Sequence, residues 1–363
     1  MTRRLFSDRL SRRDLIELGL VSAATGAVLS AGGGLADEPA RTAPTAGPAG
    51  DVFLGEGAHR YKLDPTWGRL PAGMGYGFGC AIVVDGKDRV FVTSRSVSPC
   101  VAIFSPDGTL EATWAGDFAT KVGITPERVA ATAHGLYWSK EADGEFFYFT
   151  ENKPGNRVYK TDLEGNVLYE LGAVEKPGSA AQAFTFDNPT DVAVAPNGDI
   201  YIVDGYGSQL VHQFDKDFRH KKTIGGPGTE HGKFKTCHGI WVRTIGGEPE
   251  ITIADRANDR LEVFDLDLEY KRTIEGVRKP CCFYQHDDKL FVPELDARVS
   301  IVDKDDRLVA HLGDGAGVDK AKVEDHPEVF FAPHALTLDS KGNLYVIEWL
   351  PNGRPRKFVP APV

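Results

Sequence analysis

Residues 191–215 read DVAVAPNGDIYIVDGYGSQLVHQFD, and this stretch decides the fold. Apolar and polar residues alternate in three short runs, at Asp191–Val194, Ile200–Asp204 and Leu210–Asp215, as they do in half-buried strands. A Pro-Asn-Gly turn separates the first two runs, and a second turn with two glycines separates the last two. Such turns between alternating runs are typical of antiparallel hairpins. The stretch therefore predicts consecutive strands of one antiparallel sheet.

The same unit recurs along the chain. An anchor residue taken just before the first apolar run of each unit falls at spacings of 54, 56, 48, 42 and 54 positions, on Cys80, His134, Thr190, His238, Pro280 and His334. A period near 50 with three or four strands per unit is typical of a β-propeller. The sequence thus predicts an all-β, six-bladed β-propeller over residues 55–363. Its last unit is one strand short, so we expect Tyr61–Leu63 to complete blade six and close the ring.

Composition narrows the class of protein. Of the 363 residues, 42 are Lys or Arg and 52 are Asp or Glu, and the net charge of −10 argues against a nucleic-acid partner. No segment of the mature chain contains the roughly 18 consecutive apolar residues that a membrane span needs. The five cysteines are predicted to be mostly or entirely free, buried thiols, because two of them are adjacent and a long chain needs no disulfide framework: Cys80, Cys100, Cys237, Cys281 and Cys282.

The first 36 residues read as an export signal. Ser11-Arg12-Arg13-Asp14-Leu15-Ile16 is followed by a mild apolar run from Leu18 to Leu29 and a small-residue cleavage site at Gly34–Ala36. The paired arginines indicate twin-arginine export to a periplasmic or extracellular location. An ordinary signal peptide or an interfacial helix is the alternative. Residues 37–54, rich in Pro, Ala and Gly, are predicted to be a linker.

Three of the six anchors are histidines, and they alternate: His134, His238 and His334. Alternate blades of a six-bladed ring are related by about 120°, so imidazoles at the start of their innermost strands would converge on the axis. Three nitrogen ligands with an open fourth position are typical of a catalytic Zn²⁺ site. The alternative is that each histidine separately caps a strand or fills the channel.

The ends of the second strands also reach the channel region, and there the sequence places Arg95, Tyr206 and Arg256. Two guanidiniums beside a dication would bind a carboxylate. A tyrosine near these positive charges is expected to have a lowered pKa and to act as a phenolate base. Alternatively, the arginines form loop ion pairs with Asp204, Asp255 or Asp259.

These residues resemble the peptidyl-α-hydroxyglycine α-amidating lyases, which are six-bladed propellers of NHL-type repeats. The motifs that carry the resemblance are Pro189–Val194, Val203–Tyr206, His238-Gly239 and Ala254–Arg260. The resemblance implies that the three histidines bind zinc, that Tyr206 is the base, and that Arg95 and Arg256 hold the substrate carboxylate. It also implies the reaction, in which the N–Cα bond of a carbinolamide breaks to give an amide and glyoxylate.

The chain departs from the family at two places. Ala335 stands where relatives have an Asp that helps to bind a structural Ca²⁺, and Gly207 stands where animal relatives have a disulfide cysteine. The chain is also too short to include the copper hydroxylase usually paired with this lyase, so such a partner would be a separate chain. Two alternatives stay open: a propeller hydrolase or lyase of other specificity, and a non-catalytic NHL scaffold that binds protein or glycan.

Overall fold

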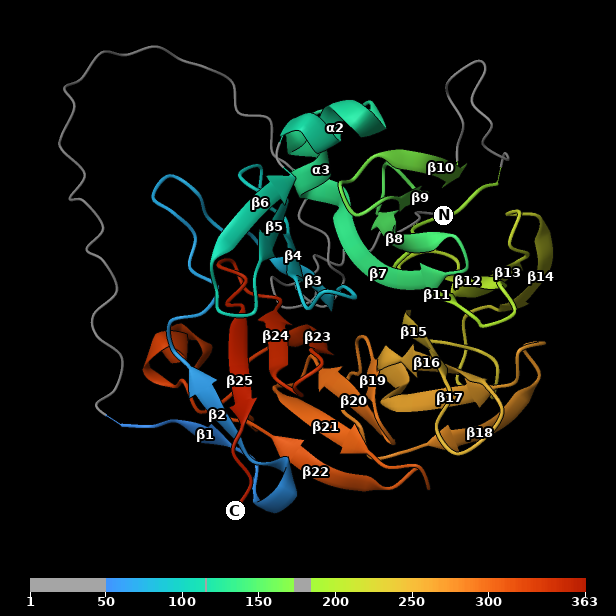
Figure 1. Cartoon of the computed structure of the whole chain (residues 1–363). Helices are drawn as coiled ribbons and strands as arrows, with labels where there is room; N and C mark the ends of the chain where they lie inside the picture. The colour runs from blue at the N-terminus through green and yellow to red at the C-terminus, as the bar shows by residue number, and fades with distance from the viewer. Residues whose placement is uncertain (1–49, 115, 173–183) are drawn as a thin grey trace, which may run out of the picture. The chain divides into compact units, whose positions relative to one another are not determined.

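A computed structural model describes residues 50–114, 116–172 and 184–363. The predicted export signal and most of the predicted linker lie outside these residues. Within them, six antiparallel sheets surround a common centre, which confirms the six-bladed β-propeller (Figure 1). The first strand of each sheet faces the centre, and the last lies on the outside of the ring.

Blades 1 to 5 each contain four consecutive strands. Blade 1 comprises β3 (Gly79–Val84), β4 (Val90–Ser94), β5 (Val101–Phe104) and β6 (Leu110–Trp114). Blade 2 comprises β7 (Ala133–Glu141), β8 (Gly144–Glu151), β9 (Arg157–Thr161) and β10 (Val167–Gly172). Blade 3 comprises β11 (Asp191–Val194), β12 (Ile200–Asp204), β13 (Leu210–Phe214) and β14 (His220–Gly225). Blade 4 comprises β15 (Cys237–Arg243), β16 (Glu250–Asp255), β17 (Arg260–Phe264) and β18 (Tyr270–Ile274), and blade 5 comprises β19 (Tyr284–His286), β20 (Lys289–Glu294), β21 (Arg298–Val302) and β22 (Leu308–Leu312).

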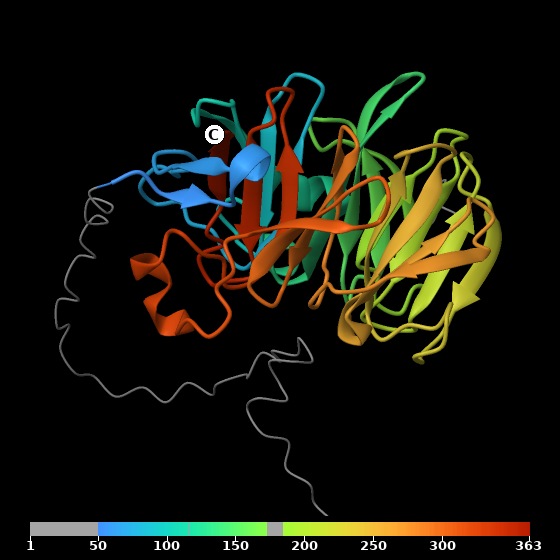
Figure 2. The same cartoon turned by 90° about the horizontal axis from the view of Figure 1, so that it is seen from below.

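Blade 6 joins the two ends of the described chain. Its strands β23 (Pro333–Leu338), β24 (Leu344–Glu348) and β25 (Arg356–Pro360) are followed by β2 (Tyr61–Asp64) and β1 (Phe53–Leu54). Strand β2 pairs with β25 in antiparallel register, with Leu63 opposite Phe358, so the predicted ring closure is confirmed (Figure 2). Strand β1 lies within the range assigned to the linker, and it is ordered there because Leu54 is buried in the core of this blade.

Short helices lie outside the blades. Helices α2 (Gly116–Val122) and α3 (Pro126–Thr132) connect blades 1 and 2, and Thr125 caps α3 by accepting the backbone N–H of Arg128. The 3₁₀ helices are η1 (Gly57–His59), η2 (Arg256–Asn258) and η3 (Lys320–Asp325). Among the residues that the structure describes, no helix has the length and apolar character to cross a bilayer.

The hydrophobic core is divided among the spaces between neighbouring blades. Six clusters of buried side chains fill these spaces, each contributed mainly by two adjacent sheets. Phe91 of blade 1 packs edge-on against Phe147 of blade 2, for example, with ring centroids 4.6 Å apart. Because the sheets are covered on both faces, their inner strands are apolar almost throughout, and polar side chains at the centre need a separate explanation.

Candidate metal centre

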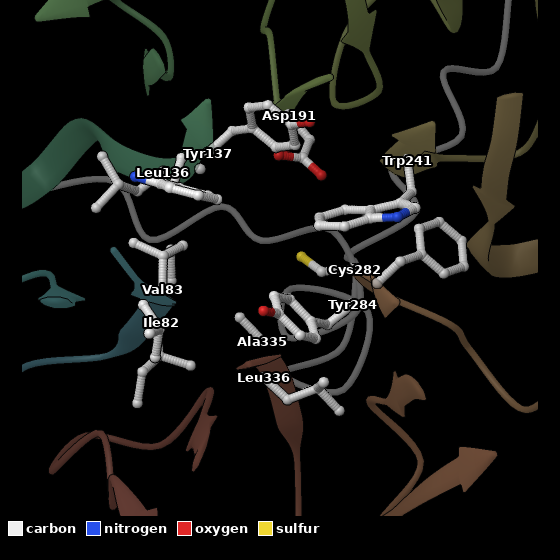
Figure 3. A pocket seen from close by; sticks show the side chains of 15 residues that line it. Ile82, Val83, Leu136, Tyr137, Asp191, Trp241, Cys282, Tyr284, Ala335 and Leu336 are labelled. Atoms are coloured by element: carbon white, nitrogen blue, oxygen red, sulfur yellow. The ribbon is translucent and has the colours of Figure 1, made fainter. Parts of the chain in front are cut away.

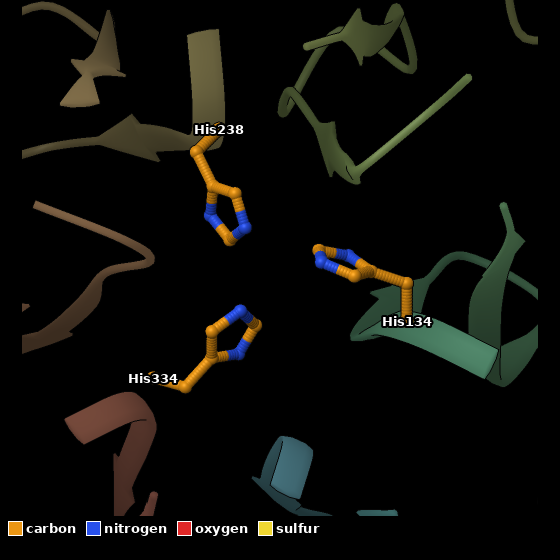
Figure 4. Close-up of side chains that lie close together, drawn as sticks. All are labelled: His134, His238 and His334. Carbon is orange, nitrogen blue, oxygen red and sulfur yellow. The ribbon is translucent and has the colours of Figure 1, made fainter. Parts of the chain in front are cut away.

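The three predicted histidines meet at the centre of the ring. His134 lies on β7, His238 on β15 and His334 on β23, and all three side chains point toward one another (Figure 4). Their ring centroids are 4.8–5.2 Å apart, and one ligand nitrogen from each lies within 4.8 Å of the others. All three residues are buried. The predicted convergence on the axis is therefore present in the structure.

A backbone carbonyl fixes the orientation of each imidazole. The Nδ1 atoms of His134, His238 and His334 lie 2.7, 2.9 and 2.7 Å from the carbonyl oxygens of Thr190, Cys281 and Cys80, respectively. A carbonyl can only accept, so Nδ1 carries the proton in each ring and Nε2 keeps its lone pair. This outer hydrogen bond is the one that metal-ligating histidines normally make. In each case the carbonyl belongs to the next blade around the ring.

The histidines are held neutral. Burial lowers the pKa of His134 and His238 well below the usual value, and lowers that of His334 to about 3. The neighbouring guanidinium of Arg256 acts in the same direction on all three, because a nearby positive charge disfavours imidazolium. Neutral imidazole is the form that binds a metal ion.

The donor set fits a Zn²⁺-type cation. Three neutral imidazole nitrogens suit zinc better than the hard cations, which prefer oxygen. The Nε2 atom of His334 is buried and makes no hydrogen bond within the described structure. An unsatisfied buried acceptor costs free energy, and a metal ion bound among the three rings would remove that cost.

Tyr206 lies beside two of these nitrogens. Its hydroxyl oxygen is 3.0 Å from Nε2 of His238 and 3.3 Å from Nε2 of His134, and Nη1 of Arg256 donates to it at 3.3 Å. Burial raises the pKa of this hydroxyl, while the charge of Arg256 lowers it. The pKa direction that we expected is thus wrong for the protein residues alone, because burial outweighs the nearby guanidinium.

Arg95 reaches the site from blade 1. It donates to the carbonyl of Ala133 and to Oδ1 of Asn152, and its guanidinium lies 4.9 Å from the ring centroid of Trp349. Trp349 in turn packs against His334 at 5.2 Å. No carboxylate within the described ranges pairs with Arg95 or Arg256.

The acids considered as partners for these arginines bond elsewhere. Asp204 accepts the backbone N–H groups of Asp187 and Asn188, and Asp255 pairs with Arg260. Asp259 accepts the N–H of Lys279. Both arginines are therefore available to an anionic ligand.

One structural rule places the surrounding side chains. We define a rim position as the residue directly after the second strand of each blade; around the ring these are Arg95, Asn152, Gly205, Arg256, Leu295 and Trp349. From blade 2 onward, each is preceded by a buried acid, and in blades 3 to 6 that acid accepts a backbone N–H from the segment entering the blade: Asp204, Asp255, Glu294 and Glu348. Asn152 and Trp349 were missed by sequence reasoning, although the spacing that found Arg95 and Arg256 also identifies them.

A second group that sequence reasoning missed holds the Tyr206 loop in place. Gln209 donates through Nε2 to the carbonyls of Gly205 and Gly207, and its Oε1 accepts the N–H groups of Thr236 and Cys237. A Cβ atom at Gly205 would lie 1.9 Å from the carbonyl oxygen of Cys237. The loop bearing Tyr206 is therefore locked against the strand that bears His238.

A small cavity of about 50 Å³ is lined by the inner strands (Figure 3). Asp191 is the one acid in its lining, and burial raises the pKa of that carboxyl to about 7. Ala335 lines the cavity as well, so it offers no carboxylate where the resembling family has Asp. Asp339 cannot take its place, because its oxygens accept hydrogen bonds from Asn343 and Tyr345.

The thiols follow the expectation. Cys80, Cys237, Cys281 and Cys282 are free, and Sγ of Cys100 donates to the carbonyl of Trp114. Burial raises the pKa of Cys80 to about 11, which leaves its sulfur a poor ligand beside the neutral imidazoles.

Comparison with known proteins shows which proteins this chain is similar to. Residues 186–214 match the model of the NHL repeat. The chain contains an NHL repeat. It is 27% identical over 315 residues to human NHL repeat-containing protein 3, covering 83% of this chain and 84% of that protein. It is 30% identical over 145 residues to a probable peptidyl-α-hydroxyglycine α-amidating lyase of Caenorhabditis elegans, covering 39% of each. The resemblance to these lyases is therefore confirmed over part of the chain.

Solved structures support the fold alone. A streptogramin B lyase superimposes with a TM-score of 0.53 at 14% identity, covering 84% of this chain and 99% of that one. A gluconolactonase from Xanthomonas campestris superimposes with a TM-score of 0.52 at 13% identity, covering 89% and 99%. Propellers of this architecture thus include enzymes of different chemistry, and the site must decide the function.

Proposed function

We propose that the protein is a zinc-dependent lyase that cleaves the N–Cα bond of an α-hydroxyglycine, releasing an amide and glyoxylate. The observation that carries the proposal is the set of three neutral imidazoles with their Nε2 atoms converging beside the Tyr206 hydroxyl. The partial match to an amidating lyase supports the same reaction.

The arginines would bind the carboxylate of the substrate. Arg95 and Arg256 approach the centre from blades 1 and 4, and neither has a carboxylate partner among the described residues. Guanidinium forks bind carboxylates with defined geometry, and this would fix the Cα atom relative to Tyr206.

Tyr206 would move the proton. A cation held by His134, His238 and His334 would supply positive charge that lowers the pKa of the substrate hydroxyl group. Tyr206 in its ionised form would accept the proton of the substrate hydroxyl. Burial raises the pKa of Tyr206, and the positive charges of Arg256 and of the cation would act against that rise. The C–O electron pair forms the aldehyde of glyoxylate while the Cα–N bond breaks, and the proton passes from Tyr206 to the amide nitrogen. The hydroxyl proton thus ends on the amide, the other product is the aldehyde, and Tyr206 returns to its ionised form.

The test measures metal and product together. We would purify the chain from residue 37, determine bound metal, and assay glyoxylate release from an N-acyl-α-hydroxyglycine. The variant His238→Ala should lose both metal and activity. The matched control is His231→Ala, because the His231 side chain is 58% exposed and stacks on Tyr270 of the outer strand β18.

Three outcomes separate the alternatives. About one zinc per chain with glyoxylate release that His238→Ala abolishes supports the lyase. Zinc without glyoxylate refutes this reaction and points to a propeller enzyme of other specificity. Absence of any bound metal refutes the metal centre and favours a non-catalytic scaffold.

Export is a second proposal, and it rests on the Ser11–Ile16 motif and the apolar run that follows. Replacement of Arg12 and Arg13 by Lys should retain the folded chain in the cytoplasm, and cell fractionation would show it. Unchanged export would refute the twin-arginine route.

A further inference from the structure

Three exposed apolar side chains lie on neighbouring loops of blade 1, the blade that supplies Arg95 to the candidate metal centre. Met74, Phe78 and Val97 are 39%, 37% and 51% exposed, and they lie on the two loops that flank strands β3 and β4 of blade 1. Large apolar side chains are costly to expose as a group, and such groups mark binding surfaces.

The two loops are fixed to each other by hydrogen bonds. The N–H of Gly75 donates to the carbonyl of Ser98 at 3.0 Å, and Oγ of Ser96 donates to the carbonyl of Gly75 at 2.6 Å. The N–H of Arg95 donates to the carbonyl of Phe78 at 2.9 Å. The loops that carry Met74, Phe78 and Val97 therefore form one preorganised surface.

This surface is continuous with the site. The Phe78 ring lies 5.1 Å from the ring of Trp349, and Trp349 contacts both His334 and Arg95. The rim is thus divided. Asn152 and Arg256 are polar, and Tyr206 follows the third rim position, whereas Leu295 and Trp349 on blades 5 and 6 are apolar.

We propose that Met74, Phe78, Val97 and Trp349 form an acyl-binding wall, which selects substrates whose N-acyl group is apolar. The inference rests on the proposed function and names its substrate class. With the carboxylate on the arginines and the Cα hydroxyl at the histidines, the third substituent of Cα is the amide nitrogen and its acyl group. The apolar wall beside Arg95 gives that group a place to lose its contact with water.

Binding of unreactive analogues tests the wall without catalysis. N-octanoylglycine and N-acetylglycine share the carboxylate and amide and differ only in acyl length. Calorimetry on the zinc-loaded protein should give at least about tenfold tighter binding of the octanoyl compound, because each buried methylene contributes a factor of about four when fully desolvated. Hippuric acid, with an aromatic acyl group, and a dipeptide Phe-Gly distinguish small acyl glycines from peptides with an apolar residue before glycine.

Substitutions in the wall test which residues cause the preference for the octanoyl compound. Phe78→Ala and Met74→Ala should reduce the octanoyl-to-acetyl ratio toward one. Val309→Ala should leave this ratio unchanged, because Val309 is 42% exposed on β22, the outermost strand of blade 5. Equal affinities in the unaltered protein, or a ratio that survives both substitutions, would overturn the proposal.

The proposal and the function on which it rests fail in different ways. Glyoxylate release at equal efficiency from short and long acyl substrates refutes the wall and leaves the lyase. Selective binding of the octanoyl analogue without any glyoxylate release supports the wall and refutes the reaction.

Discussion

Asp191→Asn tests whether the carboxyl group in the central cavity is held neutral. Asp191 is 9% exposed, and its Oδ2 accepts the backbone N–H of Ile240 at 3.2 Å. The other side chains that line the cavity are mainly apolar, including Leu136, Trp241 and Leu336. Asparagine has nearly the same shape and retains an oxygen for Ile240, so the substitution removes the ionisable group and little else.

The size of the expected effect on stability follows from the linkage between proton binding and folding. The pKa of this carboxyl is raised by burial to about 7 in the folded protein, against about 3.9 in an unfolded chain. Because the folded value is the higher one, folding requires a proton that the unfolded chain has already lost, and stability falls as pH rises from about 4 to about 7. The cost is about 1.5 kcal/mol at pH 5 and about 4 kcal/mol at pH 8.

Urea unfolding at pH 5, 6, 7 and 8, in the presence of a chelator, measures this difference. The free energy of unfolding of Asp191→Asn relative to the unaltered protein should increase by about 2.5 kcal/mol between pH 5 and pH 8. Asp143→Asn, at an exposed turn, controls for the loss of one charge. A difference that stays constant with pH would refute the reasoning and show that the carboxyl is ionised in the fold.

Three further substitutions test the support of the site. Tyr206→Phe should lower kcat by about 10²-fold or more while the bound zinc stays unchanged, because only the proton transfer is lost; loss of zinc as well would assign Tyr206 to the metal. Gly205→Ala should destabilise the fold by about 1–3 kcal/mol in urea, since its Cβ would overlap the Cys237 carbonyl, whereas Gly50→Ala, with no atom within 4 Å, should change stability by less than about 0.5 kcal/mol. Gln209→Ala should lower kcat/KM for glyoxylate release and weaken zinc binding together, because it frees the loop of Tyr206 from the strand of His238; equal losses in Gln209→Ala and in Gln285→Ala, whose amide bonds Thr244 in the loop between β15 and β16, would contradict that role.

The repeat spacing was enough to predict the ring and its closure. Turn residues and two-residue alternation are local signals, and six recurrences left one strand to be supplied from Tyr61–Leu63. The alternation of His134, His238 and His334 likewise translated into geometry, because equivalent positions of a ring face one axis. Because the ring is symmetric, the spacing of these residues in the sequence was enough to predict that they lie close together in space.

Features that depend on packing could not be predicted in this way. The sign of the Tyr206 pKa shift depends on the depth of burial, which the neighbouring blades determine and which no local motif records. Helices α2 and α3 interrupt the repeat, although Thr125-Pro126-Glu127 is a helix-start signal that could have been recognised. Gln209 was not foreseen because its four partners are backbone groups brought together only by the fold.

The carbonyl contacts of the imidazoles have a consequence for assembly. Each contact spans two neighbouring blades, and the one from His334 to Cys80 crosses the seam where the end of the chain meets its beginning. A nascent or truncated chain that lacks β25 or β2 contains all three histidines and yet cannot orient the third. Metal affinity therefore reports completion of the whole circle. A circular permutant with its seam moved to the boundary between blades 2 and 3, or between blades 4 and 5, would transfer this dependence from His334 to His134 or to His238.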